Sequence, residues 1–283
     1  MRKRIFGPIA LEVAVIGQGT WQFPTSARGV AQAIDALRAG IEHGMTHIDT
    51  AEMYGEGRSE EIVAAAIEGI PRESLFLVSK VLPSNANAKD TIRACEASLQ
   101  RLKTDYLDCY LLHWRGRVPL DETMGALERL VEDGKIRALG VSNFDVHDLR
   151  DAKAALRKHP IACNQVQYHM ASRGIEHAVI PYCQGERIAI VGYSPFGQGE
   201  FPSPRSSGGK VLEAIAKKYG KSARQVVLAF LTRLDDTFAI PKAADPKHVS
   251  ENASSDFDLD NADVRALGAA FPLPGPDEPL ALG

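Results

Sequence analysis

Eight short apolar runs recur along this chain of 283 residues, and helical material follows each of them. Short runs rich in β-branched and aromatic residues indicate strands, and continuous hydrophobicity indicates that both faces of each strand are buried. The eight predicted strands cover residues 13–20, 46–49, 75–80, 107–113, 136–142, 161–168, 188–194 and 237–241. Strands of this kind, alternating with helices, form a parallel sheet that helices cover.

The segments between these strands have the periodicity of amphipathic helices. Within residues 89–102, Ile92, Cys95, Leu99 and Leu102 recur at spacings of three and four, which places them on one helix face. Similar segments cover residues 27–44, 59–69, 121–134 and 145–159. Eight strand–helix units in about 250 residues match a (β/α)8 barrel, the TIM-barrel fold, better than an open doubly wound sheet.

The chain is predicted to form one domain, residues 1–283, because no linker rich in Pro, Gly and Ser divides it. An N-terminal hairpin is expected to close the bottom of the barrel. The one long low-complexity loop is predicted at residues 199–209, after the seventh strand, and the Pro-rich tail at 271–283 is expected to be irregular.

The charge balance and the lack of long apolar segments limit the kinds of partner. Lys and Arg number 33, Asp and Glu 36, so the formal charge of −3 provides no basic field for nucleic acid. No window approaches the roughly 18 consecutive apolar residues of a membrane span, and the N-terminus lacks the apolar core of a signal peptide. We therefore expect a cytoplasmic protein, acting as a monomer, without a nucleic-acid or membrane partner.

The cysteines do not suggest a metal site or a disulfide framework. Cys95, Cys109, Cys163 and Cys183 are scattered singly, with no CxxC spacing. Reduced and mostly buried thiols are the better interpretation, and no metal is expected.

Four ionisable residues stand at or just after the ends of three neighbouring predicted strands. Asp49, Lys80 and His113 close the second, third and fourth strands, and Tyr54 follows Asp49 in its loop. Each residue taken alone has a structural alternative. Asp49 could cap a turn, and Tyr54 could pack against the rim of the barrel. Lys80 could reach solvent, and His113 could be a histidine at the rim whose hydrogen bonds are all made within the protein. Because barrel sites form at the carboxyl ends of strands, and burial of such groups is costly unless they pair, we expect one shared site.

These four groups together suit proton transfer to a carbonyl oxygen. A lysine beside Tyr54 favours the phenolate, so we expect the phenol pKa to fall from about 10 toward working pH. Asp49 would keep Lys80 charged, Tyr54 would protonate a developing alkoxide, and His113 would donate a hydrogen bond to the same oxygen. The sequence offers no GxSxG serine and no cysteine placed beside a histidine as nucleophile. A hydride from a bound nicotinamide would complete the reaction.

Eight motifs carry a resemblance to a known family: IGQGTW (16–21), HIDTAEMYGEGRSE (47–60), LFLVSKV (75–81), LDCYLLHW (107–114), GKIRALGVSNF (134–144), NQVQYH (164–169), VGYSPFGQG (191–199) and IPKAADPKHVSEN (240–252). In this order and spacing, and over essentially its full length, the chain resembles the aldo-keto reductase superfamily. The resemblance implies an NAD(P)H-dependent oxidoreductase that reduces aldehydes, dicarbonyls or ketones. It also implies Asp49, Tyr54, Lys80 and His113 as the catalytic tetrad, with Tyr54 as general acid.

The same resemblance implies a cofactor site at the loops after several strands. Ser142, Asn143 and Gln165 would hold the carboxamide, and Tyr193 would stack on the nicotinamide ring. The loop from Ser194 would cover the pyrophosphate, and Glu251 and Asn252 would contact the adenine. The whole predicted set is Thr20, Trp21, Asp49, Ser142, Asn143, Gln165, Tyr193, Ser194, Phe196, Gly197, Lys242, Ala243, His248, Glu251 and Asn252.

Several of these residues have a plain structural alternative. Ser142 and Asn143 could form a turn, Gln165 could be a satisfied strand-end amide, and Tyr193 could be a packed rim aromatic. Glu251 and its neighbour Asn252 could belong to a solvated helix face.

One departure from the family pattern bears on the choice between NADPH and NADH. NADPH-preferring relatives commonly carry Ser and Arg where this chain has Ala243 and His248. A neutral histidine lacks both the permanent charge and the planar fork of arginine, and alanine lacks a hydroxyl donor. Lys242 remains as a point charge, so NADPH is the expected cofactor, with a weaker preference over NADH.

The substrate is expected to enter beside the tetrad, between Trp21, Tyr54, His113 and Trp114, with Met53 nearby. Either tryptophan could instead be ordinary packing at the rim. The short C-terminal tail predicts an open pocket and a small carbonyl substrate.

Two other kinds of protein remain as alternatives. One is a class I aldolase with Lys80 as a Schiff-base lysine, although a neighbouring carboxylate disfavours the neutral amine that an imine requires. The other is a nicotinamide-binding regulatory or structural barrel with little turnover.

Overall fold

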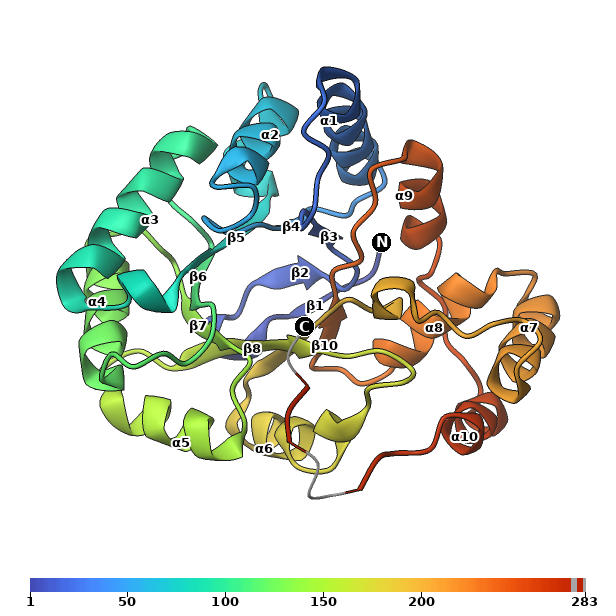
Figure 1. Ribbon diagram of the computed structural model, residues 1–283. Coiled ribbons are helices and arrows are strands. Elements are labelled where there is room, and N and C mark those ends of the chain that lie inside the picture. The colour runs from blue at the N-terminus through green and yellow to red at the C-terminus, as the bar shows by residue number, and fades with distance from the viewer. Residues whose placement is uncertain (276–278, 282–283) are drawn as a thin grey trace.

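The computed structural model describes residues 1–275 and 279–281, and a parallel eight-stranded sheet curls through its centre (Figure 1). In spatial order its strands are β3 (Gln18–Gly19), β4 (His47–Asp49), β5 (Phe76–Val81), β6 (Cys109–Leu112), β7 (Leu139–Ser142), β8 (Ile161–Gln167), β9 (Ala189–Tyr193) and β10 (Thr237–Ala239). Parallel bridges join Ile16 to Ala239 and Gly19 to Lys242, so the first and last strands meet. The predicted (β/α)8 barrel is confirmed.

The closure of the barrel depends on a close backbone approach at Gly19. A Cβ atom at this position would lie 2.7 Å from the carbonyl oxygen of Ile240. Only glycine leaves room for the two backbones to meet there.

The helices form a ring around the strands, which Figure 1 shows along the barrel axis. In the described residues they are α1 (Ala27–Glu42), α2 (Arg58–Ile67), α3 (Ala88–Leu102), α4 (Leu120–Glu132), α5 (Val146–Ala155), α6 (Val179–Glu186), α7 (Ser207–Tyr219), α8 (Ala223–Leu231), α9 (Pro246–Ala253) and α10 (Asn261–Ala270). Many begin after a polar side chain that accepts a hydrogen bond from the first turn, as N-caps do. These caps are Ser26, Asn87, Asp145, Ser206, Ser222, Asp245 and Asp260.

Several predicted elements end a few residues early or start late, and two of these differences have a clear physical cause. The run at 13–20 is not one strand: its first residues belong to β2 (Glu12–Ala14), which pairs antiparallel with β1 (Lys3–Ile5) outside the barrel. The predicted loop at 199–209 also ends early, since Ser206 caps α7 and the next three residues are helical. In the first case, pairing with β1 divides a uniformly apolar run; in the second, the Ser206 hydroxyl accepts a hydrogen bond from the Gly209 N–H at 3.0 Å and starts the helix.

The β1–β2 hairpin covers the amino ends of the barrel strands. The ring of Phe6, directly after β1, lies 4.8 Å from the ring of Phe76 and 5.0 Å from that of Phe238. These two residues stand at the beginnings of β5 and β10. In Figure 1 the hairpin accordingly crosses the middle of the strand ring. The predicted closure of the bottom of the barrel is confirmed.

Alternation along β5 decides which side chains face the barrel interior. Phe76 and Val78 belong to the apolar cluster inside the barrel, whereas Leu77 and Val81 belong to the cluster between strands and helices. Because successive strand residues point to opposite faces, Lys80 shares the inward face with Val78. Its side chain is fully buried, at the carboxyl end of the interior.

Candidate active site

The four ionisable residues predicted at strand ends lie together at the carboxyl end of the barrel. Asp49 ends β4, Lys80 stands in β5, and His113 directly follows β6. The Lys80 Nζ atom lies 2.6 Å from Asp49 Oδ1, 2.8 Å from the Thr50 carbonyl oxygen and 3.1 Å from the Tyr54 hydroxyl. These contacts use all three donors of the ammonium group. The His113 ring meets the Tyr54 ring edge-on, with centroids 5.7 Å apart.

The loop that carries Tyr54 has an unusual backbone and is tied to its neighbours. Gly55, Glu56 and Gly57 all have positive φ angles, of 59°, 57° and 90°. The Glu52 carboxylate accepts hydrogen bonds from the Leu82 backbone N–H at 2.7 Å and from the side-chain amide of Asn85 at 3.0 Å. The loops after β4 and β5 are thus fastened together, which fixes the Tyr54 hydroxyl over Lys80.

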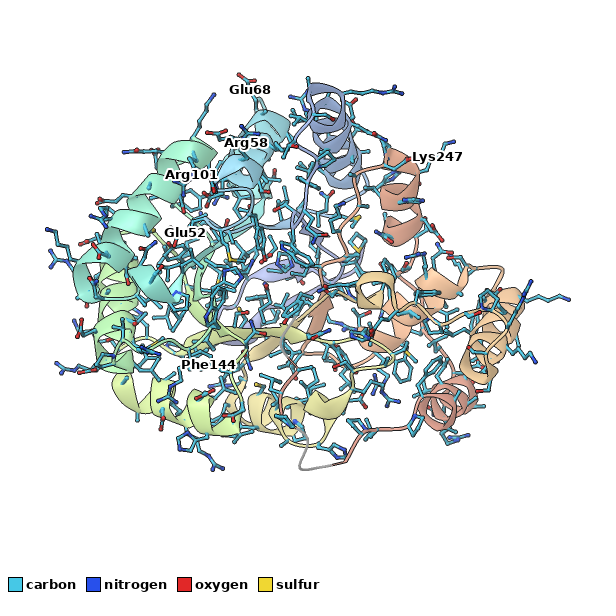
Figure 2. All side chains as sticks on the ribbon, in the orientation of Figure 1. Glu52, Arg58, Glu68, Arg101, Phe144 and Lys247 are labelled. Carbon is cyan, nitrogen blue, oxygen red and sulfur yellow. The ribbon has the colours of Figure 1, made fainter. Side chains whose placement is uncertain are left out.

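The helix that follows this loop is also held by a buried carboxylate. Glu60 of α2 accepts hydrogen bonds from Ser79 of β5 and from Arg101 of α3, both at 2.6 Å. Arg101, labelled in Figure 2, reaches from α3 toward α2. Ser79 is the neighbour of Lys80 in β5, so the Glu60 carboxylate joins the helix that follows the Tyr54 loop to the Lys80 strand and to α3.

Burial sets the protonation states in this cluster. The predicted fall in the pKa of Tyr54 is wrong: burial raises the pKa of the phenol, and the nearby Lys80 charge opposes this only in part. Burial acts to lower the pKa of Lys80, but the charges and hydrogen bonds of Asp49 and Tyr54 together outweigh it and raise this pKa, so the lysine stays cationic. Burial, with the Lys80 charge, lowers the pKa of His113 to about 3. The cluster therefore combines a protonated phenol, an ammonium and a neutral imidazole.

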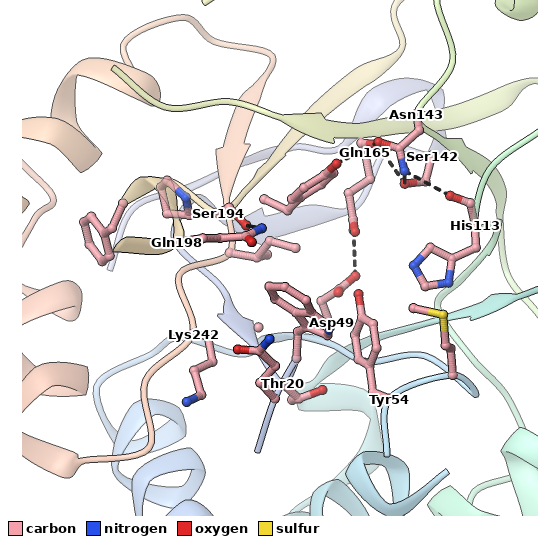
Figure 3. A pocket seen from close by; sticks show the side chains of 18 of the residues that line it. Thr20, Asp49, Tyr54, His113, Ser142, Asn143, Gln165, Ser194, Gln198 and Lys242 are labelled. Atoms are coloured by element: carbon pink, nitrogen blue, oxygen red, sulfur yellow. Dashed lines mark hydrogen bonds between the residues drawn. The ribbon is translucent and has the colours of Figure 1, made fainter. Parts of the chain in front are cut away.

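A second set of polar contacts extends from this cluster toward β7, β8 and β9. Gln165 donates to Asp49 Oδ2 at 2.7 Å, and the Ser142 hydroxyl donates to the Gln165 carbonyl oxygen at 2.9 Å. The Asn143 amide donates to the His113 carbonyl oxygen at 3.1 Å and accepts from the Tyr193 hydroxyl at 2.9 Å. Figure 3 shows Gln165, Ser142 and Asn143 along one wall of a pocket, with Asp49 below them.

The backbone at this wall is locally strained. Asn143 and Ser194 have positive φ angles of 62° and 51°. Such conformations cost free energy in residues other than glycine and often mark functional sites.

The pocket above the four residues has a volume of about 440 Å³. Its walls include many of the predicted side chains: Thr20, Trp21, Asp49, Met53, Tyr54, His113, Trp114, Ser142, Asn143, Gln165, Tyr193, Ser194, Phe196 and Lys242. Residues that sequence reasoning did not propose for the site also line it: Gly19, Gln22, Pro195, Gln198, Gly199, Phe201, Arg224 and Ile240. Most of these lie inside the quoted motifs, and Gln22 and Phe201 lie just beyond them, but Arg224 lies in α8, where no motif marks it.

Five predicted cofactor residues do not line this pocket: Gly197, Ala243, His248, Glu251 and Asn252. His248 is exposed on α9, and Asn252 is buried. The Glu251 carboxylate accepts a hydrogen bond from the Ser222 hydroxyl at the start of α8. The alternative of a solvated helix face therefore does not hold for Asn252, which is buried, and the Glu251 carboxylate bonds toward α8.

Within the described residues, no part of the C-terminal tail lines the pocket, so its mouth is open. Pro279 and Leu280 line a separate cavity, of about 400 Å³, beside His147 of α5 and His177. At the active-site pocket, Met53 and Trp114 are 38% and 37% exposed.

Other features of the described chain bear on metals, thiols and membranes. All four cysteines are free and buried, as predicted. Among the described residues, no group of three or more His, Cys, Asp or Glu side chains is placed to hold a metal ion. In that part of the chain, no helix has the length and apolar character needed to cross a bilayer.

Known proteins resemble this chain over most of its length. The model of the Aldo/keto reductase family matches residues 15–270. Methylglyoxal reductase YeaE of Escherichia coli (strain K12) is 44% identical over 265 residues, covering 93% of each chain. Glyoxal reductase of Bacillus subtilis (strain 168) is 38% identical over 256 residues, covering 88% of each chain. A solved aldo-keto reductase from Klebsiella pneumoniae, in complex with NADPH, matches all of both chains with a TM-score of 0.93 and 42% identity.

Proposed function

The chain belongs to the aldo/keto reductase family and is an NAD(P)H-dependent oxidoreductase, and from this premise we propose that it reduces small dicarbonyls with Tyr54 as proton donor. The observation that carries the assignment is the position of the Tyr54 hydroxyl. It lies 3.1 Å from Lys80 Nζ at the floor of the pocket, with the neutral His113 ring beside it.

The pocket walls fit a nicotinamide dinucleotide. NADPH, the cofactor in the similar Klebsiella structure, supplies a hydride when bound. We assign Ser142, Asn143 and Gln165 to its carboxamide and Tyr193 to the face of its ring. Lys242, a basic side chain at another part of the wall, suits a phosphate. The pocket thus offers amide-binding groups, an aromatic face and positive charge.

The protonation states support Tyr54 as an acid. With its pKa raised by burial, the phenol still carries its proton at neutral pH and is able to donate it to a carbonyl oxygen that becomes an alkoxide. The phenolate left behind would be stabilised by the Lys80 ammonium, which Asp49 holds in place at 2.6 Å. A neutral His113 is able to donate a hydrogen bond to the same substrate oxygen.

The same contacts disfavour an aldolase. Lys80 is kept cationic by Asp49, whereas an imine forms only from a neutral amine.

The substrate class follows from the mouth of the pocket and from the relatives. Trp21, Met53 and Trp114 give an apolar entrance, and no described tail residue lines it. Such a site suits a small, weakly polar carbonyl compound. Two similar proteins are named for their reduction of methylglyoxal and glyoxal. We therefore propose 2-oxoaldehydes as substrates.

The first experiment measures NADPH oxidation with methylglyoxal for the wild type and for Tyr54→Phe. We expect kcat to fall by about 10²–10⁴-fold, the usual contribution of general acid catalysis, while the Kd of NADPH stays within about twofold. Tyr182→Phe, which alters a tyrosine of α6 outside the pocket, is the matched control.

Two results would count against the proposal. Unchanged turnover in Tyr54→Phe would exclude this residue as the proton donor. Tight NADPH binding by the wild type without reduction of any of several small carbonyls would favour the alternative, a nicotinamide-binding regulatory barrel.

We also propose that the protein is a single-domain monomer in the cytoplasm and has no nucleic-acid partner. The free, buried cysteines and the formal charge of −3 support this assignment. Light scattering coupled to size-exclusion chromatography should give the mass of one chain, and a dimer mass would contradict the proposal.

A further inference from the structure

We propose that Arg224 is a second phosphate-binding side chain of the cofactor pocket, which acts with Lys242 to select a dinucleotide that carries the 2′-phosphate. The inference rests on the proposed function, because it assumes that the pocket binds a nicotinamide dinucleotide. Arg224 stands at the beginning of α8, and Lys242 follows β10. The two side chains line the same pocket from different elements.

The guanidinium of Arg224 is held in place by two aromatic rings. Its Cζ atom lies 4.8 Å from the ring centroid of Phe196 and 4.7 Å from that of Phe201. Both rings belong to the loop after β9, which also lines the pocket. Contact with ring faces orients the planar guanidinium but leaves the N–H groups at its edge available to an anion.

Neither basic side chain has an acidic partner in the part of the chain that the structure describes. Across residues 1–275 and 279–281, no carboxylate forms an ion pair or a hydrogen bond with Arg224 or Lys242. By contrast, Arg173 and Arg233 both bind Glu176, at 2.7 and 2.9 Å. Two positive groups that line one pocket, and that no described carboxylate neutralises, suit a ligand that brings negative charge into it.

Their place in the pocket indicates which part of the ligand they meet. Figure 3 shows Lys242 on the side of the pocket opposite His113, across from the wall with Asn143. A dinucleotide with its nicotinamide beside Asn143 extends its adenosine half away from His113. Arg224, at the N-terminal end of α8, is then positioned to meet a phosphate on that half.

This assignment gives the cofactor phosphate a second positively charged partner, although the side chains at positions 243 and 248 are unfavourable for phosphate binding. Ala243 has no side-chain donor, and His248 is exposed on α9, outside the pocket lining. Arginine supplies a permanent charge and paired N–H donors, which are the properties that a phosphate monoester requires. Selection of NADPH is therefore expected to depend on Arg224 and Lys242 together.

The test measures cofactor binding by calorimetry, without turnover, for the wild type and for Arg224→Leu. Leucine keeps an apolar contact with Phe196 and Phe201 but removes the charge. We expect the Kd of NADPH to rise about 10- to 100-fold, the range for loss of a charged hydrogen bond, and the Kd of NADH to change less than about threefold. Arg224→Lys should give an intermediate loss.

Arg150→Leu is the matched control, because Arg150 also lies over an aromatic ring, that of Tyr182, but outside the pocket. We expect it to bind both cofactors as the wild type does. Adenosine 2′,5′-bisphosphate and adenosine 5′-monophosphate extend the test to fragments that differ only by the 2′-phosphate. Arg224→Leu should weaken binding of the bisphosphate alone.

Equal losses for NADPH and NADH would overturn the proposal, since they would place Arg224 at the shared pyrophosphate or make it only a support for the loop. An unchanged Kd for NADPH would overturn it as well. Failure of the proposed function would look different. Either the enzyme would not turn over dicarbonyls while the ratio of its Kd values for NADPH and NADH stayed unchanged, or the wild type would bind neither cofactor.

Discussion

At the scale of single residues, Lys80 shows how a buried charge is made tolerable. Its ammonium is fully buried, and all three of its donors have oxygen partners, one of them the Asp49 carboxylate. A buried ion pair of this kind contributes little net stability compared with an apolar pair, but removing one partner leaves a charge without compensation. The pair therefore constrains mutation more than it stabilises the fold.

Lys80→Met is accordingly expected to lower the free energy of unfolding by about 3–5 kcal/mol, because the Asp49 carboxylate would remain buried without its partner. Urea denaturation followed by circular dichroism measures this change. The double variant Asp49→Asn/Lys80→Met should recover a good part of the lost stability, since it removes the stranded charge. Neither variant should regain turnover. If the double variant were no more stable than Lys80→Met, the stranded carboxylate would not be the cause.

The sequence predicted the positions of Asp49, Tyr54, Lys80 and His113, because strand ends can be located from hydrophobic runs alone. It predicted the wrong direction for the pKa of Tyr54, because the degree of burial around a side chain depends on the packed structure. The pKa of the phenol reflects two opposing effects, and only the charge of a neighbouring lysine was visible in the sequence.

At the scale of elements, the contact between α1 and the first barrel strand depends on a glycine. Gln18 of β3 is buried, and its side-chain amide donates to the backbone carbonyl oxygens of Leu37 at 3.2 Å and Met45 at 2.9 Å. A Cβ atom on Gly40 of α1 would lie only 2.1 Å from Gln18 Oε1. The strand amide thus occupies the space that a side chain on the helix would need.

Gly40→Ala is expected to destabilise the protein by about 1–3 kcal/mol, as overpacking of a buried contact does. Gly125→Ala is the matched control, since Gly125 also lies inside a helix, α4, but a Cβ atom there would have no neighbouring atom within 4 Å. Alanine there should stabilise by about 0.5–1 kcal/mol through its higher helix propensity. Thermal and urea unfolding would measure both. Equal effects of the two substitutions would refute the steric argument.

Element boundaries were predictable where hydrophobicity changes and not where the pairing partner changes. The apolar residues 13–16 form one run in the sequence, yet Val13 and Ala14 pair with β1 while Ile16 bridges to Ala239, where the first and last barrel strands meet. Arg224 was missed for a related reason. Its proposed role depends on the approach of α8 to the loop after β9, and no local pattern near residues 222–225 indicates such an approach.

At the scale of the whole molecule, the two ends of the barrel have different functions. The carboxyl end holds the polar pocket, and the amino end is closed by the hairpin through an aromatic cluster around Phe6. His47, the first residue of β4, lies within that cluster, with its ring 5.9 Å from Phe6 and 5.3 Å from Phe76. Burial there lowers the pKa of His47 to about 3, so the ring is neutral in the folded protein.

This burial makes the stability of the molecule sensitive to acid. Above pH 6.5, His47 is neutral in both the folded and the unfolded chain, so it has no effect on the pH dependence of stability. Between about pH 6.5 and 3, the unfolded chain binds a proton at His47 that the folded chain does not, and stability is lost as the pH falls. His113, with a pKa also near 3, adds a second contribution of the same sign.

Urea unfolding at several values from pH 7.5 to 4.5 should therefore show a free energy of unfolding that is nearly flat above pH 7 and declines below pH 6. Each of the two histidines contributes a slope of up to about 1.4 kcal/mol per pH unit. His47→Leu should lower stability at pH 7.5 through imperfect packing but reduce the slope by that amount, so the two curves converge in acid. Leucine has no proton to bind. If the stability curves of the wild type and His47→Leu were parallel, His47 would be protonated in the folded barrel, and its aromatic surroundings would tolerate the charge.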